Sequence, residues 1–428
     1  MPTIIAITVL ALGLMALAMP IAFSLMLSAI GVIWWNGQSL LIVPQQIISG
    51  IDSFTLLAVP FFLLAGELMT VGGMTVRLLN FAIAIVGRFK GGLAITNVVS
   101  AVLLAGISGS AVADTSALGK VLIPGMVRAG YSPAFAAALT AAANIVGPII
   151  PPSIAFILIG VLANLSITRL FLAGILPGLL YALAMLVTAV WISRKRNYPV
   201  HKAASWSEFL DATKHAFWAL LMPVLIIGGI RTGVFNVTEC SAVAVVYALI
   251  VGGLIHRELT LARIWQALVG TARVTAIIML ILGGAQIVSW LLAYNHIPQQ
   301  VSDAILAVSD NPLIFLLLVN IMLIVVGTFM EVTPSMIILV PILFPVAASL
   351  GIDLVHFSVV VALNLVIGLI TPPVAVSVSI AAMIGRVSTG AAMLEVTPFF
   401  VAAVVAQLLV TYLPFLSLWI PNTLMGTQ

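Results

Sequence analysis

Two stretches of this chain place prolines inside long apolar runs, where a helix cannot continue through them. Residues 144–153 read Asn-Ile-Val-Gly-Pro-Ile-Ile-Pro-Pro-Ser, and residues 364–373 read Asn-Leu-Val-Ile-Gly-Leu-Ile-Thr-Pro-Pro. Proline lacks a backbone N–H and its ring clashes with the preceding helical turn, so each stretch predicts a broken helix. In hydrocarbon, such a break is tolerated only where protein or a watery cavity covers the freed backbone groups. Two breaks at matching places in two halves of a membrane protein are typical of a transporter's binding site.

The composition places the chain in a lipid bilayer. Of its 428 residues, 63% are hydrophobic and 7% are charged, whereas soluble domains carry about 25% charged residues. Apolar runs of twenty or more residues favour a helical bundle over a barrel, whose strands would alternate in polarity. The net charge of +4 does not indicate a nucleic-acid partner, because the cations are scattered between the apolar segments. In that position they orient a membrane protein.

A constant offset of 221 residues relates the two halves of the sequence. It carries Gly147 onto Gly368 and Pro151-Pro152 onto Pro372-Pro373 without any gap. Chance explains an ungapped series of this kind poorly, so we predict two structural repeats. The other matched pairs are Gly31 with Gly252, Gly106 with Gly327, Pro124 with Pro345, Gly130 with Gly351, Thr168 with Thr389, and Pro177 with Pro398.

The two predicted repeats cover residues 1–200 and 217–428. An amphipathic linker at 201–216 is expected to join them as a short interfacial helix. The sequence Arg-Lys-Arg at 194–196 precedes this linker. Because cytoplasmic loops carry an excess of Lys and Arg, we expect the linker to lie in the cytoplasm.

Each repeat is expected to contain one re-entrant helical hairpin, which enters and leaves the membrane on the same face, and one proline-broken helix. We predict the hairpins at about 92–128 and 312–345, and the broken helices at about 132–163 and 354–385. Five full crossings accompany each hairpin, and this odd number inverts one half relative to the other. The predicted fold class is therefore an all-α polytopic membrane protein with two inverted repeats.

The other predicted elements follow from the apolar runs and the offset. Residues 4–36 form either one tilted span or two short spans around Pro20, and the repeat favours two. An amphipathic arm is expected at 298–309, and the offset places its counterpart at about 75–90. The remaining crossings of the second half are expected at 217–233, 238–255, 273–295 and 393–420.

Polar residues gather at the tips of the two predicted hairpins. An ionisable residue inside the bilayer costs at least about 2.5–3.5 kcal/mol, so it usually faces a cavity or a partner. On the alternative interpretation, the serines cap the following helix and the carboxylates only complement its N-terminus. The residues are Ser108, Ser110 and Asp114 in the first tip, and Gly327, Thr328 and Glu331 in the second.

The two broken helices offer backbone groups beside these tips. Unwound backbone at Gly147-Pro148 and at Gly368–Thr371 frees carbonyl oxygens. Together with hydroxyls and a nearby carboxylate, these oxygens are what a hard cation such as Na⁺ needs. The alternative, a simple proline kink, is common for one break but explains two matched breaks poorly.

An anionic substrate is the second candidate ligand of the breaks. The half-helices that begin after Pro152 and Pro373 direct their N-terminal partial charges toward an anion. Asn144 and Asn364 lie close by and either bind substrate or satisfy local backbone; the sequence does not separate these interpretations. The candidate substrate residues are Asn144, Pro152, Ser153, Asn364 and Pro373.

Several of these motifs resemble the large membrane subunit of TRAP (tripartite ATP-independent periplasmic) transporters. The longest is the run from Asp52 to Glu67, Asp-Ser-Phe-Thr-Leu-Leu-Ala-Val-Pro-Phe-Phe-Leu-Leu-Ala-Gly-Glu. Gly106-Ile-Ser-Gly-Ser-Ala-Val-Ala-Asp114 and Gly147-Pro-Ile-Ile-Pro-Pro-Ser153 belong to the same pattern, as do Thr238-Glu239 and Thr371-Pro-Pro373. The resemblance extends over essentially the whole chain.

The resemblance implies a Na⁺-coupled, elevator-type importer of organic acids in the bacterial inner membrane, without an organic cofactor. It implies two partners, a small four-helix membrane subunit and a periplasmic substrate-binding protein. Carboxylates at the positions of Asp114 and Glu331 accompany the sodium sites in the sialic-acid branch, although glutamate at 331 departs from the pattern. The sodium sites of the family map onto Ser108, Ser110, Gly147 and Pro148, and onto Gly327, Thr328, Gly368 and Thr371.

Three other functions remain as alternatives. A single-component anion transporter would work without a binding protein, coupled to Na⁺ or H⁺. A passive channel would conduct downhill without saturation. An intramembrane enzyme is disfavoured, because the sequence shows no paired nucleophile and base. Among substrates, a four-carbon dicarboxylate, a keto acid and a sialic acid all need an anion site, and no one residue selects between them.

Overall fold

The computed structural model describes residues 9–426, apart from residues 12, 16, 88, 200–204, 298 and 301–310. Within this part of the chain the regular elements are all helices. Eight of the described helical segments are long and apolar enough to cross a membrane. The predicted all-α polytopic class is confirmed.

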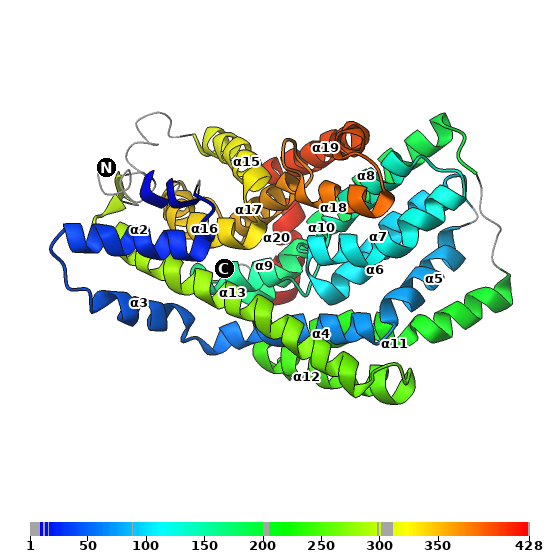
Figure 1. The fold of residues 1–428 in the computed structure, drawn as a ribbon, viewed down its shortest axis with the longest axis horizontal. Coiled ribbons are helices and arrows are strands. Elements are labelled where there is room, and N and C mark those ends of the chain that lie inside the picture. The colour runs from blue at the N-terminus through cyan, green and yellow to red at the C-terminus, as the bar shows by residue number, and fades with distance from the viewer. Residues whose placement is uncertain are drawn as a thin grey trace.

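One set of helices forms an outer layer, which we call the scaffold. Figure 1 shows α3, α4, α11, α12 and α13 along the lower side of the molecule. The scaffold comprises α2 (Ile21–Trp35), α3 (Ile42–Ile51), η1 (Phe54–Leu57), α4 (Ala58–Val71), α5 (Met74–Val86), α11 (Trp206–Arg231), α12 (Val237–Ile250), η2 (Val251–Ile255) and α13 (Leu261–Tyr294).

The remaining helices form the inner part of the molecule, which we call the core domain. It contains the two helix pairs expected as hairpins and the two helices expected to be broken. The first half contributes α6 (Gly92–Ser108), α7 (Ala111–Arg128), α8 (Pro133–Asn144), α9 (Ile154–Leu162) and α10 (Ile167–Lys195). The second half contributes α15 (Pro312–Phe329), α16 (Val332–Ser349), α17 (Leu354–Gly368), α18 (Val376–Gly385), α19 (Thr389–Tyr412) and α20 (Phe415–Met425).

The packing of the scaffold follows the offset between the halves. Shifting the bounds of α7 by 221 residues gives those of α16, and shifting α2 places it on α12 and η2. Likewise α3 and α4 shift onto α13. α13 of the second half packs along α2 of the first half, and α4 of the first half packs along α12 of the second half. Because α12 corresponds to α2 and α13 to α4, these two contacts are equivalent under the offset. How the two halves lie across a membrane stays a prediction.

Three predicted boundaries differ from those of the structure, and helix caps account for two of them. The linker is not a separate helix: Ser205 and Glu208 form a capping box that starts α11, which then continues to Arg231. The crossing predicted at 273–295 begins at Leu261, because Thr260 caps α13. The second hairpin continues to Ser349.

The closing segment, expected as one crossing at 393–420, is two helices. α19 ends at Tyr412 and α20 starts at Phe415, directly after Pro414. A proline cannot continue the preceding helix without losing a hydrogen bond. α20 then turns back to pack against α10 and α17.

The N-terminal region has the two expected segments where it is described. Residues 9–15 are helical at the described positions, a turn follows at 17–18, and α2 begins after Pro20. Residues 1–8 lie outside the described residues, as do Arg88 and most of the arm predicted at 298–309. The counterpart arm predicted at 75–90 is the helix α5.

A buried polar cluster holds three helices of the second half together. The side-chain oxygen of Asn320 on α15 accepts hydrogen bonds from Asn364 on α17 at 2.6 Å, and from Gln407 and Thr411 on α19 at 2.8 and 3.1 Å. All four side chains are buried. These three hydrogen bonds fix the positions of α15 and α19 around the broken helix. Each donor would lose a partner if the Asn320 oxygen were removed.

Replacing Asn320 with leucine should lower the stability of the chain by about 1–3 kcal/mol, the usual cost of leaving buried polar groups unpaired. Thermal unfolding of the purified protein, followed by tryptophan fluorescence, measures the loss. The matched control is Leu317→Ala on the same helix, whose side chain is exposed. A melting temperature for Asn320→Leu equal to that of the control would contradict the structural role of this cluster.

Candidate functional site

The tip of the first hairpin is closed by serine hydroxyls and one carboxylate. α6 ends at Ser108, Gly109 turns the chain with φ of 64°, and Ser110 caps α7 by accepting a hydrogen bond from the amide of Ala113. The Ser108 hydroxyl donates a hydrogen bond to Asp114 Oδ1 and accepts one from the amide of Ser110. The capping expected for Ser110 is therefore present, and Ser108 orients the carboxylate.

Asp114 keeps one oxygen free of hydrogen bonds although it lies in the interior. The residue is 1% exposed, and its Oδ2 has no hydrogen-bond partner within the described part of the chain. Its position in the first turn of α7 favours a negative charge, because the free amides there carry partial positive charge. A buried carboxylate oxygen without a partner is costly, so it indicates a ligand that the protein itself does not supply.

The first helix break lies directly against this oxygen. A Cβ placed on Gly147 would lie 2.7 Å from Asp114 Oδ2, 3.2 Å from the Asn144 carbonyl and 3.4 Å from the Ala111 amide. Two oxygens thus border a space that any side chain at position 147 would fill. The break and the tip also meet at Gly109, where an added Cβ would lie 2.7 Å from the Pro152 carbonyl.

These residues fit a sodium ion. Hard cations prefer carboxylate, carbonyl and hydroxyl oxygens, and unwound backbone supplies such carbonyls in transporters. The tip contributes Asp114, Ser108 and Ser110, and the break contributes backbone oxygens next to Gly147 and Pro148. The structure brings these five predicted residues together.

The second set of candidate sodium ligands is arranged differently, around a contact between two glycines. A Cβ on Gly368 would lie 2.3 Å from the Gly327 carbonyl carbon, and one on Gly327 would lie 2.8 Å from the Leu365 carbonyl. The backbones of α15 and α17 therefore touch. The hydroxyls of Thr328 and Thr371 each donate to a carbonyl one turn earlier in their own helices, at 2.8 and 2.9 Å.

Glu331 has no counterpart to the Ser108–Asp114 hydrogen bond. It is the N-cap residue of α16, and its side chain makes no capping hydrogen bond. Its backbone carbonyl accepts from Ser335 at 2.8 Å. The side chain is exposed, whereas Asp114 is buried. Under the offset of 221 residues Glu331 corresponds to Ser110, the N-cap residue of α7, and not to Asp114, so the two carboxylates occupy different positions as well as different environments.

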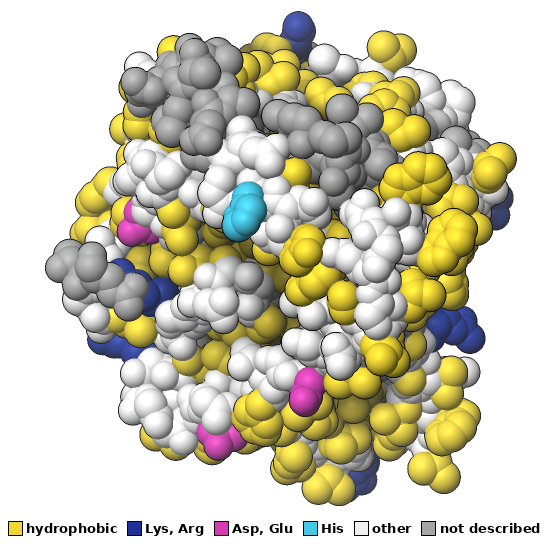
Figure 2. All heavy atoms as spheres, turned by 90° about the vertical axis from the view of Figure 1, so that its left-hand side faces the viewer, with side chains coloured by type: hydrophobic (Ala, Val, Ile, Leu, Met, Phe, Trp, Pro, Cys, Tyr) yellow, Lys and Arg dark blue, Asp and Glu magenta, His cyan; other side chains and the backbone are white. Residues whose placement is uncertain are grey.

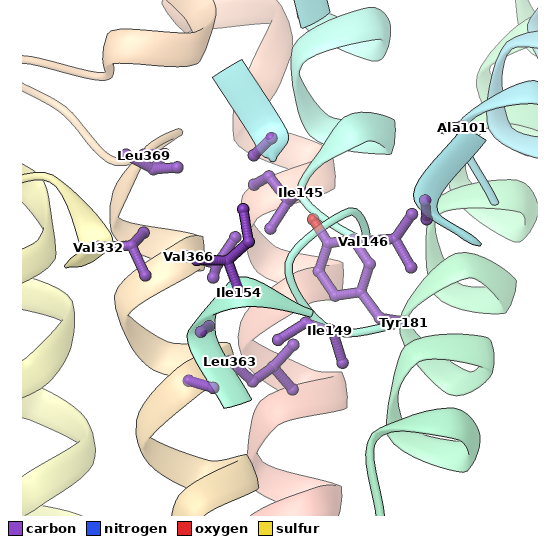
Figure 3. Close-up of a cluster of buried hydrophobic side chains, with 14 of the residues drawn as sticks. Ala101, Ile145, Val146, Ile149, Ile154, Tyr181, Val332, Leu363, Val366 and Leu369 are labelled. Atoms are coloured by element: carbon purple, nitrogen blue, oxygen red, sulfur yellow. The ribbon is translucent and has the colours of Figure 1, made fainter. Parts of the chain in front are cut away.

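A small cavity, which we call the central cavity, connects both tips and both breaks. It has a volume of about 90 Å³ and is lined by Ser110, Pro148, Glu331, Thr333 and Leu369, among others. Figure 3 shows the cluster of buried apolar side chains that these elements share: Val332 and Leu369 lie on one side, Ile154 and Val366 in the middle, and Ile145, Val146 and Tyr181 beyond them. Apolar packing therefore positions the two breaks next to each other.

Two scaffold residues close this cavity, Leu63 on α4 and Val274 on α13. The sequence did not single out either of them. α4 also approaches the first tip at Gly66, where an added Cβ would lie 3.1 Å from the Ile107 carbonyl. The signal for this approach was the small pair Ala65-Gly66 inside the motif that ends at Glu67.

The candidate substrate residues are only partly available in this conformation. The Ser153 hydroxyl donates to the Pro148 carbonyl and caps α9 by accepting from the Phe156 amide at 3.2 Å. The Asn144 amide nitrogen donates to the Thr140 carbonyl at 2.7 Å, as expected if this residue satisfies local backbone. Its side-chain oxygen has no partner among the described residues.

The other candidates differ in exposure. Pro152 is buried but Pro373 is exposed, although the two prolines are equivalent under the offset. Both Pro-Pro peptide bonds are cis. Asn364 is committed to Asn320 and to the Val360 carbonyl through its amide nitrogen.

A second, larger cavity lies between the scaffold and the core domain. Its volume is about 1020 Å³, and its lining includes Gln46 on α3, Asn164 before α10, Gln286 and Ser289 on α13 and Pro341 on α16. Uncharged polar side chains dominate its polar lining. Figure 2 looks onto the end of the molecule that carries the α2–α3 loop, where the surface is hollowed and hydrophobic side chains line the hollow.

Comparison with known proteins gives a consistent result. A family model described as "Tripartite ATP-independent periplasmic transporter, DctM component" matches residues 8–416. The sialic acid TRAP transporter large permease SiaM of Vibrio cholerae is 41% identical over 416 residues, covering 97% of each chain. The 2,3-diketo-L-gulonate TRAP transporter large permease YiaN of Escherichia coli is 41% identical over 364 residues, covering 85% of this chain and 86% of YiaN.

Two further matches extend this picture. The C4-dicarboxylate TRAP transporter large permease DctM of Vibrio cholerae is 37% identical over 443 residues, covering 98% of each chain. Among solved structures, the YdaH transporter of Alcanivorax borkumensis superposes with a TM-score of 0.64 over 88% of each chain at 16% identity. At that identity the likeness shows a shared fold only.

Proposed function

The chain belongs to the DctM family of tripartite ATP-independent periplasmic transporters, and we propose that it imports an organic acid by Na⁺-coupled transport. It is a multi-pass protein of the inner membrane, with eight candidate spans in its described part. Large permeases of this family work with a small permease and a periplasmic binding protein. We extend both partners, the small four-helix subunit and the binding protein, to this chain.

The substrate class rests on the relatives. Those named above transport a sialic acid, a diketo-gulonate or a C4-dicarboxylate. All three substrates carry at least one carboxylate. An anion of this kind suits the half-helix N-termini that follow the two breaks, where free amides point at the ligand.

One observation carries the coupling proposal: the unpartnered Oδ2 of Asp114 beside the side-chain-free face of Gly147. Bound sodium would balance the negative charge of this carboxylate, which has no cationic partner among the described residues. Ser108 holds the other carboxylate oxygen, so the ligand geometry is set before the ion arrives. The ion then links hairpin tip and break, and it fixes the tip that lines the central cavity.

The size of the central cavity supports a moving core domain. About 90 Å³ has room for roughly three water molecules, and an organic acid needs more space. Because Leu63 and Val274 of the scaffold form part of its wall, sliding the core domain along the scaffold would open the tips to one side. This is the elevator step that we propose.

Uptake by proteoliposomes tests the proposal. They should contain this chain and its small subunit, with the cognate binding protein outside, and be offered radiolabelled organic acids. The first labelled acid is chosen by a thermal-shift screen of the binding protein. We expect accumulation only with an inward Na⁺ gradient and all three proteins. Uptake that is insensitive to Na⁺ contradicts the coupling, and full uptake without the binding protein supports a single-component transporter.

A further inference from the structure

A cationic cavity lies at the opposite end of the molecule from the α2–α3 loop. Its volume is about 540 Å³, and it is lined by Phe89, Lys90, Ile95, Val190 and Arg194. These residues come from the connector between α5 and α6, the start of α6 and the last turns of α10. The α5–α6 connector and the start of α11 lie at the right-hand end of Figure 1. This end is predicted to face the cytoplasm.

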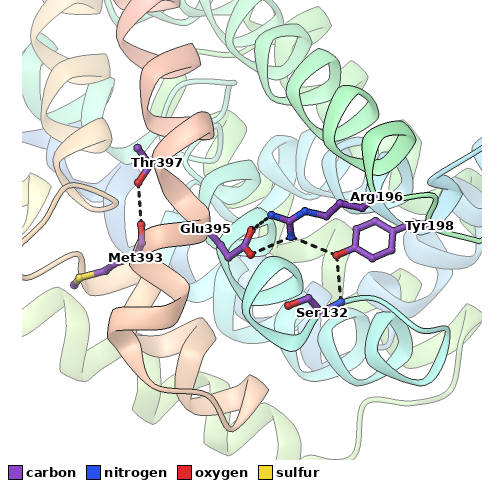
Figure 4. A network of polar contacts seen from close by, with 6 residues as sticks. All are labelled: Ser132, Arg196, Tyr198, Met393, Glu395 and Thr397. Carbon is purple, nitrogen blue, oxygen red and sulfur yellow. Dashed lines mark hydrogen bonds and ion pairs between the residues drawn. The ribbon is translucent and has the colours of Figure 1, made fainter.

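The two cations of this cavity have no anionic partner. Both Lys90 and Arg194 are exposed, and neither makes an ion pair with any residue that the structure describes. The nearby acid is already used: Glu395 on α19 forms two contacts with Arg196, at 3.0 and 2.9 Å (Figure 4). Two unpaired positive charges therefore line one cavity.

The surface of α10 below this cavity is apolar and exposed. Four side chains follow one another at four-residue spacing, which places them on a single helix face. Their exposed fractions lie between 47% and 58%. The last of them is a tryptophan, over which Lys195 lies at 5.4 Å from the ring centre. The four residues are Leu179, Leu183, Val187 and Trp191.

We propose that this cavity binds one anionic phospholipid of the cytoplasmic leaflet. The phosphate lies between Lys90 and Arg194, and an acyl chain follows the apolar face of α10 toward Leu179. A tryptophan at the end of such a face marks the depth of the headgroups, because its amphipathic ring prefers the membrane–water interface. The cavity volume is in the range of small-molecule sites.

Charge complementarity selects the occupant. Two cations without a carboxylate partner favour a headgroup with net negative charge, such as phosphatidylglycerol, over zwitterionic phosphatidylcholine. A free phosphate ion would satisfy the cations but leave the apolar face uncovered. The combination of paired cations with an apolar stripe therefore indicates a lipid.

The site bridges the two parts of the molecule. The α5–α6 connector joins the scaffold to the first hairpin, and α10 leads into the linker before α11. The connector packs tightly on α10 at Gly91, which has a φ of 75° and where an added Cβ would lie 2.4 Å from Ser193 Cβ. A lipid at this position stabilises the contact between connector and α10. Its binding does not depend on the coupling ion or the substrate.

Native mass spectrometry and thermal unfolding of the chain, purified with its small subunit, test this site. The probes are palmitoyl-oleoyl phosphatidylglycerol, the matching phosphatidylcholine, and inorganic phosphate. The test variant is Lys90→Gln/Arg194→Gln. The matched control is Lys214→Gln/Arg257→Gln, which also removes two exposed cations.

We expect phosphatidylglycerol to raise the melting temperature of the wild type and of the control, and phosphatidylcholine and phosphate to have little effect. The test variant should bind phosphatidylglycerol about 30-fold more weakly, given what two basic residues contribute near anionic lipid. Its melting temperature in phosphatidylcholine should match the wild type, which shows that it is folded. Equal binding by test variant and control, or full competition by inorganic phosphate, would overturn the proposal.

Discussion

Replacing Gly147 with alanine is expected to weaken the binding of the coupling Na⁺ strongly while leaving a folded protein. The added methyl group would lie 2.7 Å from Asp114 Oδ2 and 3.2 Å from the Asn144 carbonyl. It would therefore occupy the space between the two oxygens that we assign to the ion. Changes outside the ligand shell already weaken metal binding by about 10–100-fold, so we expect a sodium half-saturation at least about 100-fold higher.

Initial rates of uptake against external sodium concentration measure this effect in the reconstituted system. Gly125→Ala is the matched control, because it lies on α7 with nothing within 4 Å of the added methyl group. A Gly147→Ala variant with the wild-type sodium dependence would show that the ion is not held here. Asp114→Asn serves as a second variant, since it preserves the shape of the side chain but removes its charge.

Replacing Gly368 with alanine is expected to prevent the chain from accumulating in a folded form. The new Cβ would lie within 2.6 Å of three backbone atoms of Gly327, namely Cα, the carbonyl carbon and the oxygen. Backbone cannot move aside by changing rotamer, so α15 and α17 would have to separate. Overpacking of a core costs typically about 1–3 kcal/mol and sometimes more, and separating two helices here also strains the Asn320 cluster that joins them.

Expression yield and melting temperature of the purified protein test this second prediction. Gly390→Ala provides the control, because it adds a methyl group to helix α19 with nothing within 4 Å. Alanine favours helix over glycine by about 1 kcal/mol, so the control should be at least as stable as the wild type. A Gly368→Ala protein that melts with the control would refute the close contact between α15 and α17.

The sequence was most informative where backbone chemistry leaves few choices. Pro148, Pro151 and Pro152 each remove a helix hydrogen bond, and together they interrupt the helix: α8 ends at Asn144 and α9 starts at Ile154. The offset of 221 residues then carried this reasoning to the second half, where α17 ends at Gly368 and α18 begins at Val376. A single proline is a weaker signal, because Pro124 and Pro177 lie inside α7 and α10. The clustering of prolines and its recurrence at the offset identified the breaks.

It was least informative where tertiary packing decides. The start of α11 is not such a case, because the capping box of Ser205 and Glu208 is a local sequence signal. Asp114 and Glu331 were both assigned to hairpin tips, yet the first is buried and accepts a hydrogen bond from Ser108, and the second is exposed. Which carboxylate is enclosed depends on how closely each break approaches its tip, and that distance is a property of the folded chain.

The positions of Leu63 and Val274 on the central cavity also had no sequence signal of their own. Leu63 and Val274 are ordinary apolar residues of lipid-crossing helices, and only the structure places them on the central cavity. Their position matters for the mechanism, because a wall that belongs to another part of the molecule can be left behind when the core domain moves. The assignment of the site residues to two sodium ions remains a prediction that binding data must test.

The most direct test of the account is whether sodium binds at Asp114. Thermal unfolding of the purified chain, titrated with NaCl against choline chloride at constant ionic strength, measures this binding without substrate or binding protein. A ligand that binds only the folded state stabilises it by about 2.7 kcal/mol at 100 times its dissociation constant. We predict a saturable rise in melting temperature for the wild type that is absent in Asp114→Asn. An equal rise in both proteins, or none in the wild type, would contradict the sodium site proposed here.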